Sequence, residues 1–140
     1  IINQLQFSIP VSNMVANGLE VNMTSSGAAD YDGSVLDYSR LHDMTIQAWS
    51  PFQMPNWEGC FIDSEKYPKL NDELQVLAQK YQVSKTTIAT TWILRHPARM
   101  QVITGTTSED RIAEIICAEN VPLSREEWYR LYLSAGHVLP

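Results

Sequence analysis

Three short apolar runs along the chain predict β-strands. They span residues 2–7, 44–49 and 100–104, and each is rich in β-branched or alternating apolar positions. A proline lies within three residues of the end of the first two runs, and Gly105 directly follows the third. Because proline and glycine interrupt a β-ladder, each strand has a defined end.

Five further stretches carry the apolar spacing or the capping residues of α-helices. We expect helices at residues 35–41, 69–81 and 85–95, after Ser108, and at 125–135. The expected N-caps are Ser34, Ser84, Ser108 or Thr107, and Ser124, which forms a capping box with Glu127, and Gly136 closes the last helix. The residues expected to face inward include Ile88, Trp92 and Ile93 in one helix and Ile112, Ile115 and Ile116 in another.

The order of these elements predicts an α/β fold with a parallel sheet and helical crossovers. Such sheets place their functional loops at the carboxyl ends of the strands. Here those loops follow Phe7, include residues 49–52, and include residues 105–107. Residues 8–33 are predicted to be irregular, with one short helical turn around residues 13–20.

Composition favours a single soluble globular domain over residues 1–140, because 44% of the residues are hydrophobic. The formal net charge of −6, without any block of like charges, argues against nucleic acid or an anionic membrane as a partner. No apolar run approaches the roughly 20 residues of a spanning helix, and no signal peptide is recognisable. We therefore expect a cytoplasmic protein.

Two cysteines, Cys60 and Cys117, are too few for a disulfide framework or a zinc site, and we expect both to be buried, reduced thiols. The chain begins within an apolar strand and has no initiator methionine. We expect it to be a piece of a longer protein.

The segment after the third strand could bind an anion. Gly105, Thr106 and Thr107 lead into a helix N-terminus, where free N–H groups and the helix dipole favour negative charge. Arg111, in the first turns of that helix, could add a forked donor for a phosphate. A plain helix cap with a solvated arginine explains the same residues, and the residues alone favour that simpler interpretation.

Two other residues allow a binding role or a structural one. Trp49 could offer its indole face to a flat heterocycle or be a core tryptophan, and Gln4 could hold a bound amide or a neighbouring side chain. The three histidines lack metal-ligand spacing, and neither a glycine-rich nucleotide motif nor a nucleophile elbow is present.

Taken together, several motifs resemble the C-terminal half of an aldo-keto reductase, over nearly the whole chain. The matching segments are residues 3–8 (Asn-Gln-Leu-Gln-Phe-Ser), 48–52 (Ala-Trp-Ser-Pro-Phe), 92–97 (Trp-Ile-Leu-Arg-His-Pro), 102–107 (Val-Ile-Thr-Gly-Thr-Thr), Arg111-Ile112 and 135–137 (Ala-Gly-His). The tryptophan before Ser50-Pro51 and the Gly-Thr-Thr turn resemble a bacterial branch of that family. The resemblance implies that the three strands are the sixth, seventh and eighth of a (β/α)8 TIM barrel. It also implies an enzyme that reduces aldehydes or ketones with NADP(H) as its cofactor.

The resemblance also implies roles for individual residues. Gln4 would hold the nicotinamide carboxamide and Trp49 would stack on the nicotinamide ring, while the loop with Ser50, Pro51 and Phe52 would wrap the pyrophosphate. Gly105, Thr106, Thr107 and Arg111 would bind the 2′-phosphate of the adenosine, and Glu114 would recognise the adenine edge.

The chain departs from the family pattern in two ways. Gly105 stands where many members have a lysine, which removes a charge from the phosphate site, although Arg111 still favours NADPH. The family's catalytic Asp, Tyr, Lys and His lie in the first half of the barrel, which has no counterpart here. The resemblance therefore implies that this piece alone is inactive and names no catalytic residue in it.

Two hypotheses remain open. The chain is either the cofactor-binding part of a carbonyl reductase that acts on a small carbonyl substrate, or a non-catalytic α/β interaction or regulatory module that binds no nucleotide. In either case three parallel strands leave two exposed edges, so we expect copies of the chain to associate as a homo-oligomer.

Overall fold

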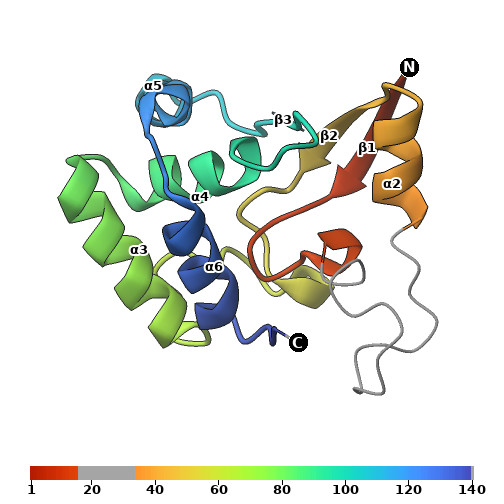
Figure 1. The fold of residues 1–140 in the computed structure, drawn as a ribbon. Helices are drawn as coiled ribbons and strands as arrows, with labels where there is room; N and C mark the ends of the chain where they lie inside the picture. Colours follow the sequence, from red (N-terminus) through yellow and green to blue (C-terminus); the bar gives the residue numbers. More distant parts are fainter. Residues whose placement is uncertain (16–33, 140) are drawn as a thin grey trace.

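The computed structural model describes residues 1–15 and 34–139. In this part of the chain, strands alternate with helices along the sequence, as Figure 1 shows. The elements are β1 (Ile2–Gln6), α2 (Ser34–Leu41), β2 (Thr45–Trp49), the 3-10 turn η1 (Pro55–Trp57), α3 (Pro68–Tyr81), α4 (Lys85–Leu94), β3 (Gln101–Val102), α5 (Glu109–Ile116), the 3-10 turn η2 (Cys117–Asn120) and α6 (Arg125–Ser134). Most of the predicted irregular segment 8–33 lies outside the described residues.

The strands form one parallel sheet in the order β1-β2-β3. Gln6 is in register with Trp49, and Ala48 with Val102, so the carboxyl ends of all three strands meet at one edge. The structure thus confirms the α/β fold and the parallel pairing. The third strand is shorter than predicted, because only Gln101 and Val102 pair with β2 as strand residues.

The two faces of the sheet differ in polarity. Ile46 and Ala48, at alternate positions of β2, are fully buried on the face that joins the hydrophobic core. On the other face, Gln47 accepts a hydrogen bond from Gln4 Nε2 and donates one to Gln101 Oε1, both of 2.9 Å. Gln4 thus has a neighbouring side chain, Gln47, as a hydrogen-bond partner.

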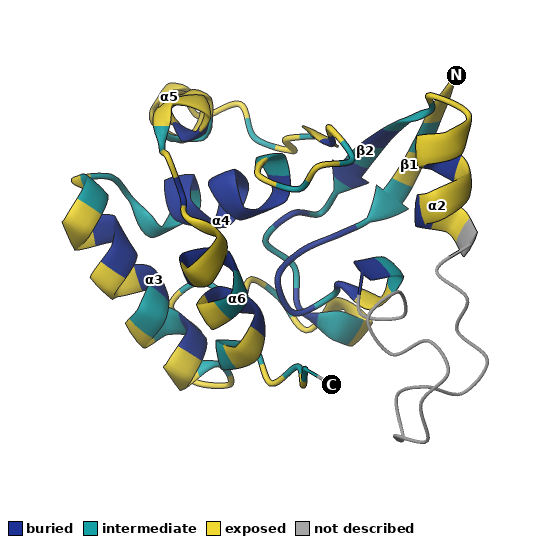
Figure 2. Ribbon diagram, viewed as in Figure 1, coloured by how far each residue is buried: buried dark blue, intermediate teal, exposed yellow. Residues whose placement is uncertain are grey.

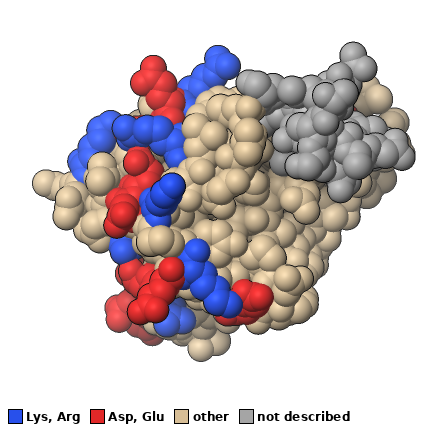
Figure 3. Space-filling model, turned by 90° about the horizontal axis from the view of Figure 1, so that it is seen from below, with Lys and Arg blue, Asp and Glu red and all other residues tan. Residues whose placement is uncertain are grey.

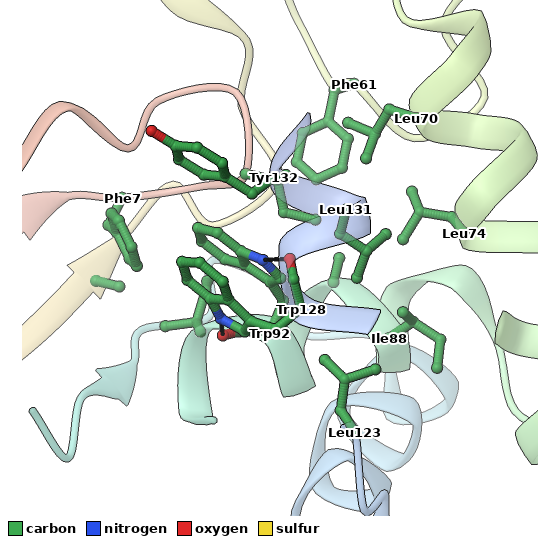
Figure 4. Close-up of a cluster of buried hydrophobic side chains, with 14 of the residues drawn as sticks. Phe7, Phe61, Leu70, Leu74, Ile88, Trp92, Leu123, Trp128, Leu131 and Tyr132 are labelled. Atoms are coloured by element: carbon green, nitrogen blue, oxygen red, sulfur yellow. Dashed lines mark hydrogen bonds between the residues drawn. The ribbon is translucent and has the colours of Figure 1, made fainter. Parts of the chain in front are cut away.

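A stacked pair of tryptophans forms the centre of the core. The rings of Trp92 in α4 and Trp128 in α6 lie 4.6 Å apart between centroids and are nearly parallel, at 8°. Each indole Nε1 donates a hydrogen bond to the backbone oxygen of the other tryptophan, as the dashed lines in Figure 4 show. Apolar side chains from α3, including Leu70 and Leu74, complete the cluster. Because both N–H groups are satisfied, the two large side chains can be buried without a polar penalty.

Helix α4 is the central helix of the structure. Seven of its residues are buried, and Figure 2 shows it enclosed by its neighbours. Ile88, Trp92 and Ile93 are fully buried, which confirms their predicted inward positions.

The predicted caps have mixed outcomes. Ser84 Oγ accepts a hydrogen bond from Thr87 N, and Ser124 and Glu127 form the complete capping box. Gly136 follows α6 with φ of +95°, a conformation that favours glycine. Ser108 is the N-cap residue of α5, as predicted, but its side chain makes no capping hydrogen bond. Ser34 is the first residue of α2 rather than the residue before it.

Helix α5 does not bury the face predicted for it. Ile112 and Ile116 are 37% and 63% exposed, and only Ile115 is half-buried. The apolar spacing is that of an amphipathic helix, but the described part of the chain provides no element that covers this face. The prediction for the cysteines is also corrected, because Cys60 and Cys117 are free but exposed.

Charged side chains are interspersed on the surface. On the face shown in Figure 3, acidic and basic residues gather together on one side, and signs alternate within that group. Among the described residues, no helix has the length and apolar character needed to span a membrane.

Candidate cofactor-binding cleft

A cleft of about 750 Å³ opens at the carboxyl ends of the strands. It is lined by Trp49, Ser50, Pro51, Phe52, Gln53, Gly59, Cys60, Ile62, Asp63, Thr86, Ile103, Thr104, Gly105, Thr106, Arg111 and Ile115. The segment after β2 forms one wall and the segment from β3 into α5 forms the other. This volume lies within the range of sites for small molecules and cofactors.

The loop after β2 is held in place by backbone pairing. Gln53 and Cys60 form an antiparallel bridge, Met54 N donates to Gly59 O, and Ser8 Oγ donates to Gln53 O over 2.8 Å. The last of these bonds ties the loop to the end of β1.

The same loop contains several residues in the left-handed region. Ser50, Asn56, Trp57 and Asp63 all have φ between 50° and 61°, although none of them is glycine. Such conformations cost roughly 1 kcal/mol or more each and persist where the surroundings impose them, commonly at binding sites. Four of the seven described non-glycine residues with positive φ thus lie in the loop that lines the cleft.

Trp49 presents a ring at the start of this loop. It is half-buried and stacks on Trp57, with 5.5 Å between ring centroids and 18° between planes. Trp57 itself is 66% exposed. Trp49 is therefore accessible from the cleft and is not a core tryptophan, so the binding interpretation of this residue has a geometric basis.

The opposite wall offers donors to an anion. Thr106 Oγ1 accepts a hydrogen bond of 3.2 Å from Ser108 N, which leaves the hydroxyl hydrogen of Thr106 free to donate. Because Ser108 does not cap α5, its side chain leaves the first-turn N–H groups of that helix without an acceptor. Arg111, the third residue of α5, also lines the cleft.

Acidic residues reduce the positive charge of this wall. Glu109 and Asp110 occupy the first turn of α5, next to Arg111. Asp63, across the cleft, forms an ion pair with Lys85 Nζ at 2.6 Å. Although Cys60 is exposed, partial loss of water around its thiol in the cleft raises the pKa of the thiol, and Asp63 adds to this effect, while the backbone of Ile62 and the charge of Arg111 oppose it. Cys60 thus lies in the cleft as a neutral thiol.

The cleft brings together most of the residues predicted from the sequence. Seven of the predicted residues line it: Trp49, Ser50, Pro51, Phe52, Gly105, Thr106 and Arg111. Gln4, Thr107 and Glu114 are outside its lining. Gln4 lies two residues before the level of Trp49 in the sheet register, and Glu114 lies on the helix beyond Arg111.

Sequence reasoning missed the second half of the loop and the start of α4. Cys60, Ile62 and Asp63 enter the cleft because the bridge between Gln53 and Cys60 folds the loop back. Thr86 enters from the first turn of α4. Gly59, whose φ of +103° favours glycine, is a sequence signal of this reversal.

Comparison with known proteins decides the family. The model for the Aldo/keto reductase family matches residues 8–132, which is most of the chain. The chain belongs to the aldo/keto reductase family. The resemblance inferred from the sequence motifs is thereby confirmed.

Three curated proteins are similar to this aldo/keto reductase chain. A 6-dehydroglucose reductase of Agrobacterium fabrum is 27% identical over 89% of the chain and 39% of its own length. A 6-dehydroglucose reductase of Novosphingobium aromaticivorans is 32% identical over 79% of the chain and 36% of its own length. Oxidoreductase YdhF of Escherichia coli is 27% identical over 59% of the chain and 28% of its own length, in line with the expected bacterial branch. The chain therefore spans well under half the length of these relatives.

A solved structure supports the fold. The thermostable aldo-keto reductase Tm1743, crystallised with the inhibitor epalrestat, superposes with a TM-score of 0.64 at 18% identity. The match covers 96% of this chain and 39% of that protein. The three-stranded sheet and its helices thus have the fold of part of such a barrel, as expected.

Proposed function

We propose that this chain is the NADP(H)-binding part of a cytoplasmic carbonyl reductase that reduces an aldehyde or a ketone. The observation that carries the proposal is the cleft itself, in which an accessible aromatic ring, Trp49, and a cation at a helix start, Arg111, line one cavity. A flat ring binds to the first and a phosphate to the second. The two exposed, unpaired cysteines are in keeping with a reducing compartment.

The residues present fit such a cofactor. A Cβ atom built on Gly105 would meet nothing within 4 Å, so the turn before α5 leaves open space for a phosphate. Thr106 and the first-turn N–H groups of α5 would donate to it, and Arg111 would add a charge-assisted pair. When bound, the nicotinamide supplies a hydride to the carbonyl carbon.

The residues of this chain hold and orient the cofactor in this proposal. Trp49 would support the nicotinamide ring, and the loop with Ser50, Pro51 and Phe52 would cover the pyrophosphate and exclude water. Among the described residues that line the cleft, Arg111 is the single cation. Glu109 and Asp110 lie beside it and reduce the positive charge of this wall. We therefore expect the preference for NADPH over NADH to depend on Arg111 alone among these residues.

The substrate pocket and the proton donor belong to the longer protein in this proposal. None of the chain's tyrosines matches the motif of the family's catalytic tyrosine, so we expect no turnover by this chain alone. Two of its relatives are named 6-dehydroglucose reductase, which makes 6-dehydroglucose the first carbonyl compound to test with a chain of full family length. The alternative, a regulatory α/β module without nucleotide, predicts no binding of NADPH.

Cofactor binding by the chain itself tests the proposal. We expect NADPH to bind more tightly than NADH, as measured by quenching of tryptophan fluorescence and by calorimetry. Arg111→Ala should weaken NADPH binding about tenfold or more and leave NADH binding nearly unchanged, because the lost pair is with the 2′-phosphate.

Arg99→Ala is the matched control, since Arg99 is exposed and lies outside the cleft. It should leave binding of both nucleotides unchanged. Equal loss of both nucleotides in Arg111→Ala, or an absence of NADPH binding at millimolar concentration, would contradict the proposal.

A further inference from the structure

A second cavity, of about 390 Å³, lies apart from the cofactor cleft. It is lined by Val15, Leu36, Asp37, Arg40, Arg95, His96, Pro97, Arg125, Trp128 and Tyr129. No described residue lines both cavities. Thr86 in the first turn of α4 lines the cofactor cleft and Arg95, just beyond its last turn, lines the second cavity, so the ten-residue helix separates them by roughly 15 Å.

Three guanidinium groups converge on this cavity. Arg40 comes from α2, Arg95 from the end of α4, and Arg125 from the start of α6. Among the described residues, none of them forms an ion pair with a carboxylate. Among the described residues of the lining, Asp37 is the single acidic one, so these residues together carry a formal charge of +3 − 1 = +2 in a chain whose net charge is −6.

The remaining contacts are apolar and aromatic. Trp128 and Leu36, each 8% exposed, line the cavity together with Pro97. Arg125 lies over the ring of Tyr129, 5.9 Å from its centroid. A largely apolar cavity of this size with a few convergent polar groups is the usual form of a small-molecule site.

The environment of His96 agrees with an excess of positive charge. Burial lowers the pKa of His96 to about 4, and the nearby charge of Arg40 contributes to this shift. Its Nδ1 accepts a hydrogen bond from Ala98 N, which requires an unprotonated nitrogen. At neutral pH the ring therefore adds an uncharged, flat surface beside the arginines.

We propose that this cavity binds a small aromatic anion, that is, a flat apolar ring bearing a phosphate or a carboxylate. The ring would lie against Trp128 and His96, and the oxyanion would face Arg40 and Arg125. Guanidinium groups bind such oxyanions through paired, charge-assisted hydrogen bonds. The site is independent of the proposed cofactor cleft and would remain if that proposal failed.

Phenyl phosphate is the probe for the test, with benzyl alcohol and inorganic phosphate as comparators. Calorimetry should show that phenyl phosphate binds more tightly than either comparator, because only it offers both the ring and the charge. Arg40→Gln and Arg125→Gln should each weaken binding about tenfold. Both side chains are exposed, so we expect these variants to fold, as checked by circular dichroism.

Two controls locate the site. Arg99→Gln removes an exposed arginine outside both cavities, and Arg111→Ala removes the cation of the cofactor cleft; neither should change the affinity for phenyl phosphate. Bound phenyl phosphate should also shift the ring resonances of His96 in an NMR spectrum.

Three outcomes would overturn the proposal. Equal binding of benzyl alcohol would show an apolar pocket without anion recognition. Loss of binding in Arg111→Ala would place the anion in the cofactor cleft. Absence of binding at millimolar phenyl phosphate, with folded protein, would leave the arginine cluster without a ligand of this class.

Discussion

Glu127 is the residue with the most concentrated set of polar contacts. Its carboxylate accepts hydrogen bonds from Lys80 Nζ at 2.5 Å, from Tyr81 Oη at 2.7 Å and from Ser124 N at 2.8 Å. Glu127 is 4% exposed and joins the end of α3 to the start of α6, although its partner Lys80 is exposed. Burial alone would raise the pKa of Glu127, but these hydrogen bonds outweigh it and lower the pKa to about 2.

This shift predicts a pH dependence of stability. The folded-state pKa of Glu127 lies below that of the unfolded chain, so the stabilisation is complete above about pH 4.5 and is lost as the pH falls towards 2. The shift corresponds to at most about 3 kcal/mol, less the screening at the exposed Lys80 side chain. Glu127→Gln should lower the free energy of unfolding by about 1–3 kcal/mol at pH 7, as measured by urea denaturation.

Glu126→Gln is the control for this prediction, because Glu126 lies in the same helical turn but is exposed. It should change stability by less than about 0.5 kcal/mol. Between pH 4.5 and 2 the stability of Glu127→Gln should vary less steeply than that of the wild type. An equally steep acid dependence in both would show that other carboxylates are responsible.

At the scale of elements, two serines occupy the same sequence context but differ in structure. Ser108 and Ser124 both precede a helix that has two acidic residues in its first turn. Ser124 Oγ accepts from Glu127 N, whereas the side chain of Ser108 makes no capping bond and its own N–H instead donates to Thr106.

The two serines therefore predict different effects of the same substitution. Ser124→Ala should lower the free energy of unfolding by about 1 kcal/mol, because it removes the side-chain acceptor for the Glu127 N–H. Ser108→Ala should change it by only a few tenths of a kcal/mol. Urea denaturation of both variants measures this difference, and equal losses would show that the capping bond is not the source.

The sequence predicted most elements because their signals are local. Alternation followed by proline located β2 to within one residue, and apolar spacing with the Ser84 cap located α4. The predicted buried face of α5 and the predicted length of β3 were wrong for one reason. Both depend on contacts with residues that are distant in the sequence or absent from the described part of the chain. The isoleucines of α5 needed a covering element, and β3 needed pairing beyond Val102.

The cleft could be predicted on its strand-derived side only. Trp49, Gly105 and Arg111 follow strands directly, so the rule for carboxyl ends of parallel strands applies to them. Asp63 and Thr86 reach the cleft through a loop reversal and an ion pair between Asp63 and Lys85, which no local spacing encodes. The left-handed conformation of Ser50 also could not be predicted, because serine has no preference for it.

At the scale of the whole molecule, some of the most exposed apolar side chains lie on the edge strand β1 and on helix α5. Ile1 and Ile2, at the start of the edge strand β1, are 94% and 58% exposed, and Ile116 of α5 is 63% exposed. Strands β1 and β3 each have one unpaired edge among the described residues. The relatives that the chain matches are more than twice its length, and a closed barrel has no such edges.

We propose that separate copies of this chain associate through these edges in solution. Unpaired N–H and C=O groups on an edge strand pair readily with another strand, and a lysine on such a strand opposes that pairing. Sedimentation velocity at micromolar concentration should show dimers or larger species for the wild type. Ile2→Lys should shift the distribution towards monomer, because it places a charge on β1.

Val76→Lys is the matched control, since Val76 is 53% exposed but lies on α3, away from the sheet edges. A compact monomer in the wild type, or equal dissociation in both variants, would contradict association through the edge of β1 and would leave the open sheet stable in water by itself.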